Sequence, residues 1–289
     1  MLLTGFCVSP MLAQDIIKQK VKQSQQSDQE DDQTERRMWL LMNRENTKPP
    51  ASNKPKSKKS TPKPSQPSNT IKAQAETTEE TAVGITIWRV PLPANDDSKA
   101  VRIKANTPIS AGDQIFFTVE APRDGYLYVI DREQYDDGDF SAPDLIFPLT
   151  SIRNGNNHIT AGVLVRIPDR NDKKLYFDVT SKKPKHIGEA LTIIIKPDRI
   201  ENLPARETIS PLPEKDFKQW ENEWGTSTDI ERLNLVGGED QKITAAEKES
   251  SNEGKRKLTY GDPLPQSVYR LVVKKGNPIF ITLPLSLKK

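Results

Sequence analysis

The chain has 289 residues, of which 34% are hydrophobic and 29% are charged, so we expect part of it to bury too little apolar surface to fold. Its formal net charge of +3 is too small for the basic face of a nucleic-acid-binding domain, which argues against a nucleic-acid partner. No apolar run reaches the roughly 20 residues of a membrane-spanning helix, so no transmembrane segment is expected.

The N-terminus predicts export. Residues 2–12 are mostly apolar and are followed by Ala13, which resembles the end of a secretory signal peptide. The basic segment that normally precedes such a stretch is missing, which a start codon upstream of Met1 would explain; the alternative is a short buried helix. We expect residues 1–14 to be a signal peptide and the mature chain to be periplasmic or associated with the cell envelope. Cys7 would be removed with the signal peptide, so the mature chain would have no cysteine. Disulfides, thiolate nucleophiles and cysteine-bound zinc would then all be excluded.

Residues 15–82 predict a disordered linker. The segment 48–69 contains six lysines and six prolines, a composition typical of an extended and solvated spacer. Its positive charge leaves open a docking site for an anionic envelope polymer. An apolar island at residues 38–42, which includes Trp39, interrupts the linker. It either docks on the folded domain or anchors a partner as a short helix.

Folded sequence is expected from Val83 onward. Between residues 83 and 200, apolar runs of about four to eight residues recur, bounded by Gly, Pro, Asn or Asp. Short strands without intervening helices favour an antiparallel sandwich or barrel, and of these we expect one β-sandwich, immunoglobulin-like in class. The residues expected at its centre are Ile115, Phe117, Val119, Tyr128, Ile130, Phe147, Val163, Val165, Leu175, Phe177, Val179, Ile193 and Ile195.

Residues 201–289 are expected to pack on this sandwich as a helix, a flexible loop and a C-terminal β-hairpin. Phe217, Trp220 and Trp224 recur at helical spacing after two prolines and before a glycine. We expect this aromatic stripe to cover the sandwich rather than to form a ligand platform. Two alternating strands follow near the C-terminus, joined around Gly276, and they either complete the sandwich or add a separate edge.

The sequence offers few catalytic groups. His158 and His186 are the two histidines, and both are expected on exposed loops without a nearby acid or serine motif. No nucleophile-elbow, zinc-protease or phosphate-binding-loop motif occurs. We therefore expect no enzyme activity and no cofactor, although a carboxylate pair that is assembled in space leaves no motif in the sequence.

One acidic loop, residues 131–139, follows a predicted strand and holds five acids. Three interpretations are open: a calcium cage, a tip that a partner contacts, or a solvated hairpin tip. The spacing is not that of the helix–loop–helix calcium site. Asp136, Asp137 and Asp139 are typical of a hairpin tip, where Asp tolerates the turn and its charge discourages edge pairing, and they are only weak calcium candidates. The candidate partner-binding residues are Tyr135, Asp136, Asp137, Phe140 and, in the linker, Trp39.

The middle of the chain carries a pattern of strand and turn motifs. Gly112–Asp113 opens a strand, Asp124–Val129 ("DGYLYV") follows a turn, and Leu145–Pro148 and Gly162–Pro168 complete the pattern. Over roughly residues 85–197 it resembles the bacterial family called domain of unknown function 4384. The resemblance implies a β-sandwich module that occurs in envelope proteins and beside caspase-like peptidases and protein kinases. It implies no catalytic residue, because no activity belongs to the module itself.

Two functions are open at this point. The first is a non-catalytic exported interaction or scaffold module of the bacterial cell envelope, whose partner is another envelope protein or an envelope polymer. The alternative is a secreted hydrolase or carbohydrate-binding protein that uses the acidic loop 131–139 and the aromatic residues beside it. A hydrolase needs a concave pocket in which at least two carboxylates face each other, whereas a scaffold presents a flat or edge-rich surface.

Overall fold

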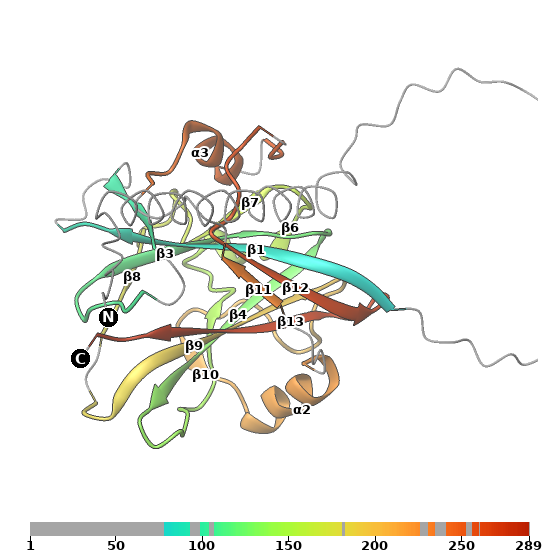
Figure 1. Ribbon diagram of the computed structural model, residues 1–289. Coiled ribbons are helices and arrows are strands. Elements are labelled where there is room, and N and C mark those ends of the chain that lie inside the picture. Colours follow the sequence, from blue (N-terminus) through green and yellow to red (C-terminus); the bar gives the residue numbers. More distant parts are fainter. Residues whose placement is uncertain are drawn as a thin grey trace, which may run out of the picture.

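A computed structural model describes most of the chain from Thr78 to Lys288 (Figure 1). The predicted signal peptide, the linker up to residue 77 and the island with Trp39 lie outside the described residues. The described ranges are 78–92, 99–103, 107–180, 183–225, 231–234 (backbone only), 241–252, 256–259 and 261–288.

The described residues form an all-β sandwich of two antiparallel sheets, as the strand pattern predicted (Figure 1). The first sheet contains β1 (Thr78–Val90), β2 (Val101–Ile103), β3 (Gln114–Glu120), β7 (Leu164–Ile167), β8 (Phe177–Asp178), β11 (Glu231–Asn234) and β12 (Ser267–Lys274). The second contains β4 (Gly125–Tyr135), β5 (Asp144–Phe147), β6 (His158–Ile159), β9 (His186–Lys196), β10 (Ser210–Pro211) and β13 (Ile279–Ser286). Two α-helices complete the described part, α2 (Glu214–Trp224) and α3 (Ala245–Ser251).

The strand order places β3 and β4 inside their sheets. The first sheet runs β11-β12-β1-β3-β7, with β2 beside β1 and β8 beside β3. The second runs β10-β5-β4-β9-β13, with β6 beside β4. The immunoglobulin-like class of this sandwich stays a prediction.

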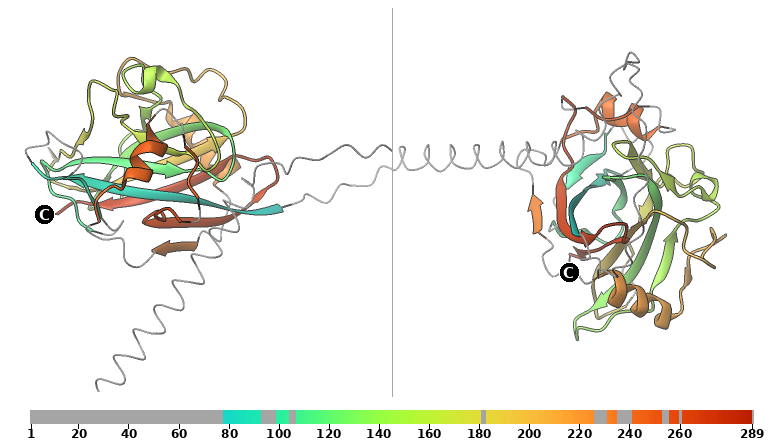
Figure 2. Two further views of the ribbon diagram at one scale, coloured as in Figure 1. Left: turned by 90° about the horizontal axis from the view of Figure 1, so that it is seen from above. Right: turned by 90° about the vertical axis from the view of Figure 1, so that its right-hand side faces the viewer.

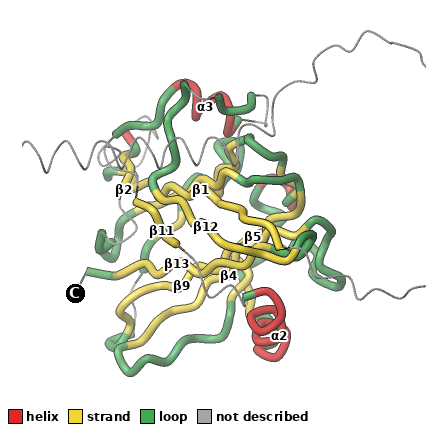
Figure 3. The backbone as a smooth tube through the Cα atoms, turned by 45° about the vertical axis from the view of Figure 1, so that its right-hand side comes forward, coloured by secondary structure: helices red, strands yellow, loops and turns green. Residues whose placement is uncertain are grey.

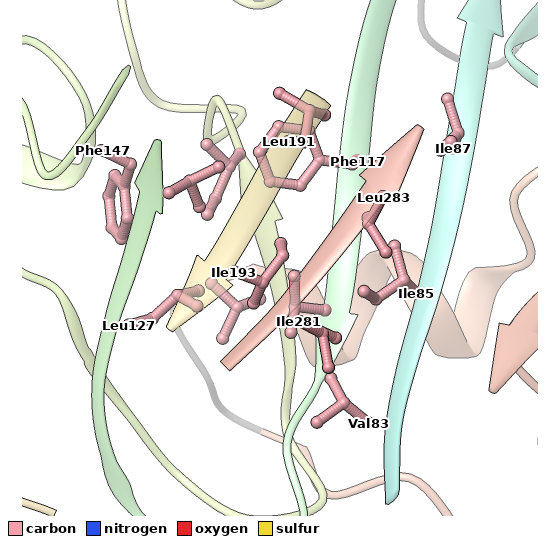
Figure 4. Close-up of a cluster of buried hydrophobic side chains, with 14 of the residues drawn as sticks. Val83, Ile85, Ile87, Phe117, Leu127, Phe147, Leu191, Ile193, Ile281 and Leu283 are labelled. Carbon is pink, nitrogen blue, oxygen red and sulfur yellow. The ribbon is translucent and has the colours of Figure 1, made fainter. Parts of the chain in front are cut away.

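The core lies between the two sheets, where every second residue of a strand points inward. Figure 4 shows Phe117 of β3 and Leu191 and Ile193 of β9 pointing into the space that the sheets share. Burying one such side chain stabilises the fold by about 1.5–3 kcal/mol. The predicted core residues that lie in this cluster are Ile115, Phe117, Val119, Phe147, Val165, Val179, Ile193 and Ile195, with Phe177 half-buried against it.

Three predicted core residues lie on outer faces instead. Tyr128 and Ile130 of β4 pack in the layer under α2, and Leu175 packs on the outer face of the first sheet. The inward residues of β4 are Leu127 and Val129. The prediction was wrong because β4 is covered on both faces, so its near-continuous apolar run does not distinguish the inside from the outside.

Helix α2 covers the outer face of the second sheet (Figure 3). Phe217 is buried against Phe280 of β13, with ring centroids 6.1 Å apart. Trp220 and Trp224 are half-buried and stack on each other at 5.7 Å. The aromatic stripe therefore covers the sandwich, as predicted. Neither this helix nor any other helix in the described residues is long and apolar enough to cross a membrane.

Helix α3 lies on the opposite side of the sandwich from α2 (Figure 2). On this outer face of the first sheet Trp88 and Phe116 stack at 5.7 Å, and Glu247 of the helix forms a buried ion pair with Arg102 of β2. The expectation of a flexible loop was wrong for this helix. A capping box between Thr244 and Glu247 starts it, and the spacing of these two residues is a signal that the sequence carries.

The two C-terminal strands do not form the predicted hairpin. β12 pairs with β1 in the first sheet, and β13 pairs with β9 in the second. The turn around Gly276, whose φ is +84°, therefore crosses from one sheet to the other. The sandwich begins at Thr78, before the predicted start at Val83, and its last strand ends at Ser286. The strands were predicted correctly, but alternation does not identify a partner strand.

Candidate functional site

A pocket of about 230 Å³ lies between the two sheets at the end of the sandwich where β13 finishes, near the end marked C in Figure 1. Strands β3, β4, β5, β8 and β9 contribute its walls together with the last residues of β13. Among the described residues no basic side chain lines it. Its polar lining is dominated by five carboxylates: Asp131, Glu133, Asp144, Asp178 and Glu189.

The acidic wall arises from the alternation of β4. Leu127 and Val129 point into the core, and the next inward positions along the strand are Asp131 and Glu133. On the neighbouring strand β9 the inward series of apolar residues likewise ends at Glu189. The inner face of the second sheet is therefore apolar along most of its length and acidic at one end.

The carboxylates face one another across neighbouring strands. Asp131 of β4 is the direct antiparallel partner of Asp144 of β5, and Glu133 of β4 is the direct partner of Glu189 of β9. Direct partners have Cβ atoms about 4.5–5.5 Å apart, and like charges in such pairs destabilise a sheet. Inward charges often protect edge strands from pairing with other chains. That role does not explain the carboxylates of β4, because β4 lies between β5 and β9.

Two of the pocket carboxylates have a close cation. Lys183 Nζ donates a hydrogen bond to Glu133 Oε2 at 2.6 Å, and the hydroxyl of Tyr135 donates to the same oxygen. Burial alone would raise the pKa of Glu133, but these hydrogen bonds outweigh it and hold the pKa below its ordinary value. On the far wall, Asp178 pairs with Lys174 at 2.9 Å.

The other three carboxyl groups hold their protons more tightly than free ones. Burial, with the charge of Asp144, raises the pKa of Asp131 to about 7. Burial, with the charges of Asp131 and Glu133, raises the pKa of Glu189 to about 9. Burial and then the charge of Glu133 also raise the pKa of Asp144. The Oδ1 atom of Asp131 and the Oε2 atom of Glu189 are shielded from solvent and have no hydrogen-bond partner among the described residues.

His186 lies behind the acidic wall and is buried. Its Nε2 atom is 3.1 Å from Oε1 of Glu189 and 2.9 Å from the backbone oxygen of Gly188. The edge of its ring meets Tyr135, with centroids 6.3 Å apart. The prediction of an exposed loop histidine was wrong here, because β9 already begins at His186, where it pairs with Tyr135 of β4.

The opposite wall of the pocket is apolar. Phe117 of β3 and Phe177 of β8 stack at 5.9 Å, and Ile115 lies beside them. One apolar wall and one acidic wall suit a small molecule with an apolar body and an end that is cationic or donates hydrogen bonds. The described residues contain no group of three His, Cys, Asp or Glu side chains placed to hold one metal ion.

The predicted acidic loop divides into two parts. Asp131 and Glu133 belong to β4 and line the pocket, so their assignment to an exposed loop was wrong. Asp136, Asp137 and Asp139 are exposed at the tip between β4 and β5, where a hairpin connection was predicted. The loop assignment failed for the first two because the alternation of the strand continues past the last apolar residue.

The other candidate residues surround this tip. Asp137 pairs with Lys185 at 3.0 Å. Phe140 is 42% exposed, and the guanidinium group of Arg132 lies 4.9 Å from its ring centroid. Tyr135 is half-buried and turns toward the pocket side of the hairpin. The calcium-binding and partner-binding roles of these residues stay predictions.

Sequence reasoning missed Asp144, Asp178 and Glu189 as site residues. Glu189 stands two positions before Leu191 in the alternating series of β9, so its inward orientation was readable. Its position opposite Glu133 was not, because the register of β4 against β9 is set by pairing between distant segments.

No protein-family model matches the chain, and no curated protein or solved structure is significantly similar to it. The resemblance to the domain of unknown function 4384 therefore stays a prediction. The function has to be argued from the pocket and its surroundings.

Proposed function

We propose that this chain is a non-catalytic, exported binding module of the bacterial cell envelope, and that it acts through the acidic end of its sandwich. The acidic end comprises the pocket carboxylates Asp131, Asp144 and Glu189 and the hairpin tip, residues 136–140. Its partner is another envelope protein or an envelope polymer. A small chemical group of that partner would enter the pocket.

One observation carries the proposal: carboxylates occupy inward positions of β4 and β9, and each of these strands has a neighbouring strand on both sides. Apolar residues at Asp131 and Glu189 would extend the core and remove the repulsion between like charges. The carboxylates therefore lower the stability of the domain. Proteins retain such locally unfavourable choices mainly at functional sites.

Export is supported by the sequence before the sandwich. Residues 2–12 are apolar, and the segment 48–69 is rich in lysine and proline, as expected for a secretory signal and a spacer. The absence of a recognisable catalytic motif favours binding over catalysis.

The test uses the native protein with a C-terminal tag added to its gene in its own bacterium, so that the natural start is kept, and recovers it from separated cell fractions. We expect it in the envelope or periplasm, with an N-terminus near Gln14. Native mass spectrometry and cross-linking then compare the wild type with a pocket variant, Asp131→Asn/Glu189→Gln, and a tip variant, Asp136→Asn/Asp137→Asn. A ligand or partner lost in one of the two variants supports the site.

Recovery of the chain with Met1 intact from the cytoplasm would contradict export. The same bound molecules and partners in all three proteins would contradict the acidic end as the site.

A secreted hydrolase or carbohydrate-binding protein is the second candidate, and one observation favours it. Glu133 and Glu189 are direct partners whose pKa values are shifted in opposite directions, the first downward and the second upward. Glycosidases use one ionised and one protonated carboxyl group in this way. Turnover of a polysaccharide or glycoside that is lost in both Glu133→Gln and Glu189→Gln would replace the binding proposal.

A further inference from the structure

We infer that the pocket binds a primary ammonium group carried on a short apolar chain. The inference rests on the proposed binding function and specifies the class of ligand that this site takes.

The size and the apolar wall of the pocket define the body of the ligand. A cavity of about 230 Å³ is smaller than the roughly 300–1,000 Å³ of pockets for drug-sized molecules. Phe117, Phe177 and Leu191 line it, so a short hydrocarbon chain would lose contact with water there.

The charges define the head of the ligand. Glu133 and Asp178 have lysine partners, whereas Asp131 and Asp144 form no ion pair with a described residue. A cation between them would meet two carboxyl groups that have no ion-pair partner and are partly shielded from solvent, where the attraction between charges is stronger than in water. An ammonium group also brings three hydrogen-bond donors, which match oxygens from more than one strand.

A metal ion fits this pocket less well than an organic cation. Calcium takes six to eight oxygens that converge at about 2.3–2.6 Å. The described residues hold no cluster of three ligating side chains around one point. The pocket carboxylates are instead spread over β4, β5 and β9 and face an apolar wall.

Binding of a cation is coupled to the release of protons. In the free pocket the pKa of Asp131 is raised to about 7 and that of Glu189 to about 9, so both groups carry protons over part of the neutral range. A bound cation favours their ionised forms and lowers both pKa values. Affinity should therefore increase as pH rises from about 6 to 9, while an alkylammonium group, with a pKa near that of lysine at about 10, stays charged.

The neighbouring charges do not reverse this direction. The pKa of Asp144 is also raised, so it adds to the same trend. Glu133 and Asp178 have lowered pKa values and stay ionised over this range. The other charged and titratable groups around Asp131, Asp144 and Glu189 are Glu133, Tyr135, Asp178, Lys183, His186 and, beside Asp144, Arg206.

Isothermal titration of the full chain with n-butylamine tests the inference, with n-butanol as the neutral compound of the same shape. We expect butylammonium to bind about tenfold or more tightly at about pH 9 than at about pH 6, because two carboxyl groups must ionise. Titrations in two buffers of different ionisation enthalpy should show net release of protons. Butanol should bind at least about tenfold more weakly at the higher pH.

A matched pair of variants locates the binding. Asp131→Asn/Glu189→Gln should lose about tenfold or more of the affinity at high pH and most of the pH dependence. The control variant Asp198→Asn/Glu221→Gln, which makes the same two changes at exposed positions outside the acidic end, should bind like the wild type. Thermal unfolding of each protein shows whether it is folded; should the pocket variant unfold, the butanol comparison and the pH profile of the wild type decide the question without it.

Equal binding of butanol and butylamine, or binding of the amine that does not change with pH, would overturn the inference. A neutral molecule retained by the wild type and lost in the pocket variant would overturn it and leave the proposed binding function standing. No pocket-dependent binding of any molecule would overturn the inference, and the proposed function would fall with it unless the tip variant Asp136→Asn/Asp137→Asn loses a partner.

Two sources could supply the ammonium group, a free amine or a lysine side chain of a protein. A blocked peptide with one lysine, titrated beside butylamine, distinguishes them. Tighter binding of the peptide assigns the site to a lysine side chain, and tighter binding of butylamine assigns it to a free amine; weak binding of both at the higher pH counts against the inference.

Discussion

Two glutamates, a buried one on the first sheet and a half-buried one in the second, are held in opposite ways. Glu247 lies on the outer face of the first sheet and pairs with Arg102, each with a side chain 4% exposed. Its Oε2 atom accepts hydrogen bonds from the backbone and the hydroxyl of Thr244, at 2.9 and 2.8 Å. The guanidinium group of Arg102 also lies 5.1 Å from the ring centroid of Trp88. Every charge in this group has a partner.

Glu189, on the inner face of the second sheet, has carboxylates where Glu247 has an arginine. Glu133 is its direct cross-strand partner, and after burial the charge of Asp131 raises its pKa further. The Nε2 atom of His186 lies 3.1 Å from its Oε1 atom. A buried carboxylate with its charge and lone pairs satisfied belongs to the fold. A carboxylate surrounded by like charges lowers stability until a proton or a cation neutralises it. This difference distinguishes a structural acid from a candidate binding acid.

The largest effect on the free energy of unfolding is expected when the ion pair between Glu247 and Arg102 is broken. Glu247→Ala leaves Arg102 buried, with the carbonyl of Leu264 at 2.6 Å as a remaining hydrogen-bond partner. Removing one partner of a buried ion pair usually destabilises by about 3–5 kcal/mol. Urea unfolding of the full chain measures this loss, with Glu221→Ala on the exposed side of α2 as the control. A loss no larger than that of the control would mean that the ion pair is not structural.

A change of the opposite sign in the free energy of unfolding is expected at Glu189, whose cross-strand partner is another carboxylate. Glu189→Gln removes one charge from the repulsive pair with Glu133 and keeps the size of the side chain. We expect a gain in the free energy of unfolding of up to about 1 kcal/mol at about pH 9, which is the range for cross-strand pairs. The same urea experiment measures it. A destabilisation as large as that of Glu247→Ala would show that the contact between Glu189 and His186 stabilises the fold.

The pH dependence of stability sharpens the same contrast. The pKa of Glu189 is about 9 in the folded chain, against an ordinary value of 4.5. The contribution of this group to the free energy of unfolding is therefore fully present below pH 4.5 and is lost as pH rises toward 9. Asp131 acts in the same direction between 3.8 and about 7. The unfolded chain loses these protons first, so we expect the urea midpoint of the wild type to fall between about pH 5 and pH 9.

Glu189→Gln should make this fall shallower, and Glu221→Gln, the matched exposed change, should leave it as it is. Carboxyl groups whose pKa is lowered, such as Glu133, change stability only at more acidic pH and do not mask the effect. Parallel pH profiles of wild type and Glu189→Gln would assign the dependence to other groups.

The same contrast explains what the sequence predicted and what it did not. The strands, the sandwich and the cover by α2 follow from alternation and helical spacing, which are local patterns. The position of Tyr128 and Ile130 does not, because both faces of β4 are apolar. The pocket required two registers, β4 against β5 and β4 against β9, that bring Asp144 and Glu189 opposite β4 from distant segments. Pairing between distant segments is not a local property of the chain.

A smaller effect is expected at the hairpin tip, which carries three carboxylates, none of them in the pocket. Asp136→Asn/Asp137→Asn removes the pairing of Asp137 with Lys185, in which both side chains are exposed to solvent. We expect no measurable change in the urea midpoint and a pH profile above about pH 5 like that of the wild type. A clear loss of stability would show that the tip supports the ends of β4 and β5, and the two acidic groups would then differ less than their burial suggests.

The smallest effect, and the one that tests the tip as a metal site, is that of calcium. A cage requires carboxylates that converge and repel one another until a cation arrives. At the tip, Asp137 instead accepts hydrogen bonds from Lys185 and from the backbone N–H of Asp139, and these, in that order, lower its pKa. Its charge is therefore matched by a lysine that calcium would have to displace. We expect the melting temperature of the full chain to be the same in millimolar calcium and in chelator, within about one degree. Calcium at 100 times its dissociation constant would add about 2.7 kcal/mol and raise the melting temperature by about 5–10 °C. Such a shift, lost in Asp136→Asn/Asp137→Asn, would establish the tip as a calcium site.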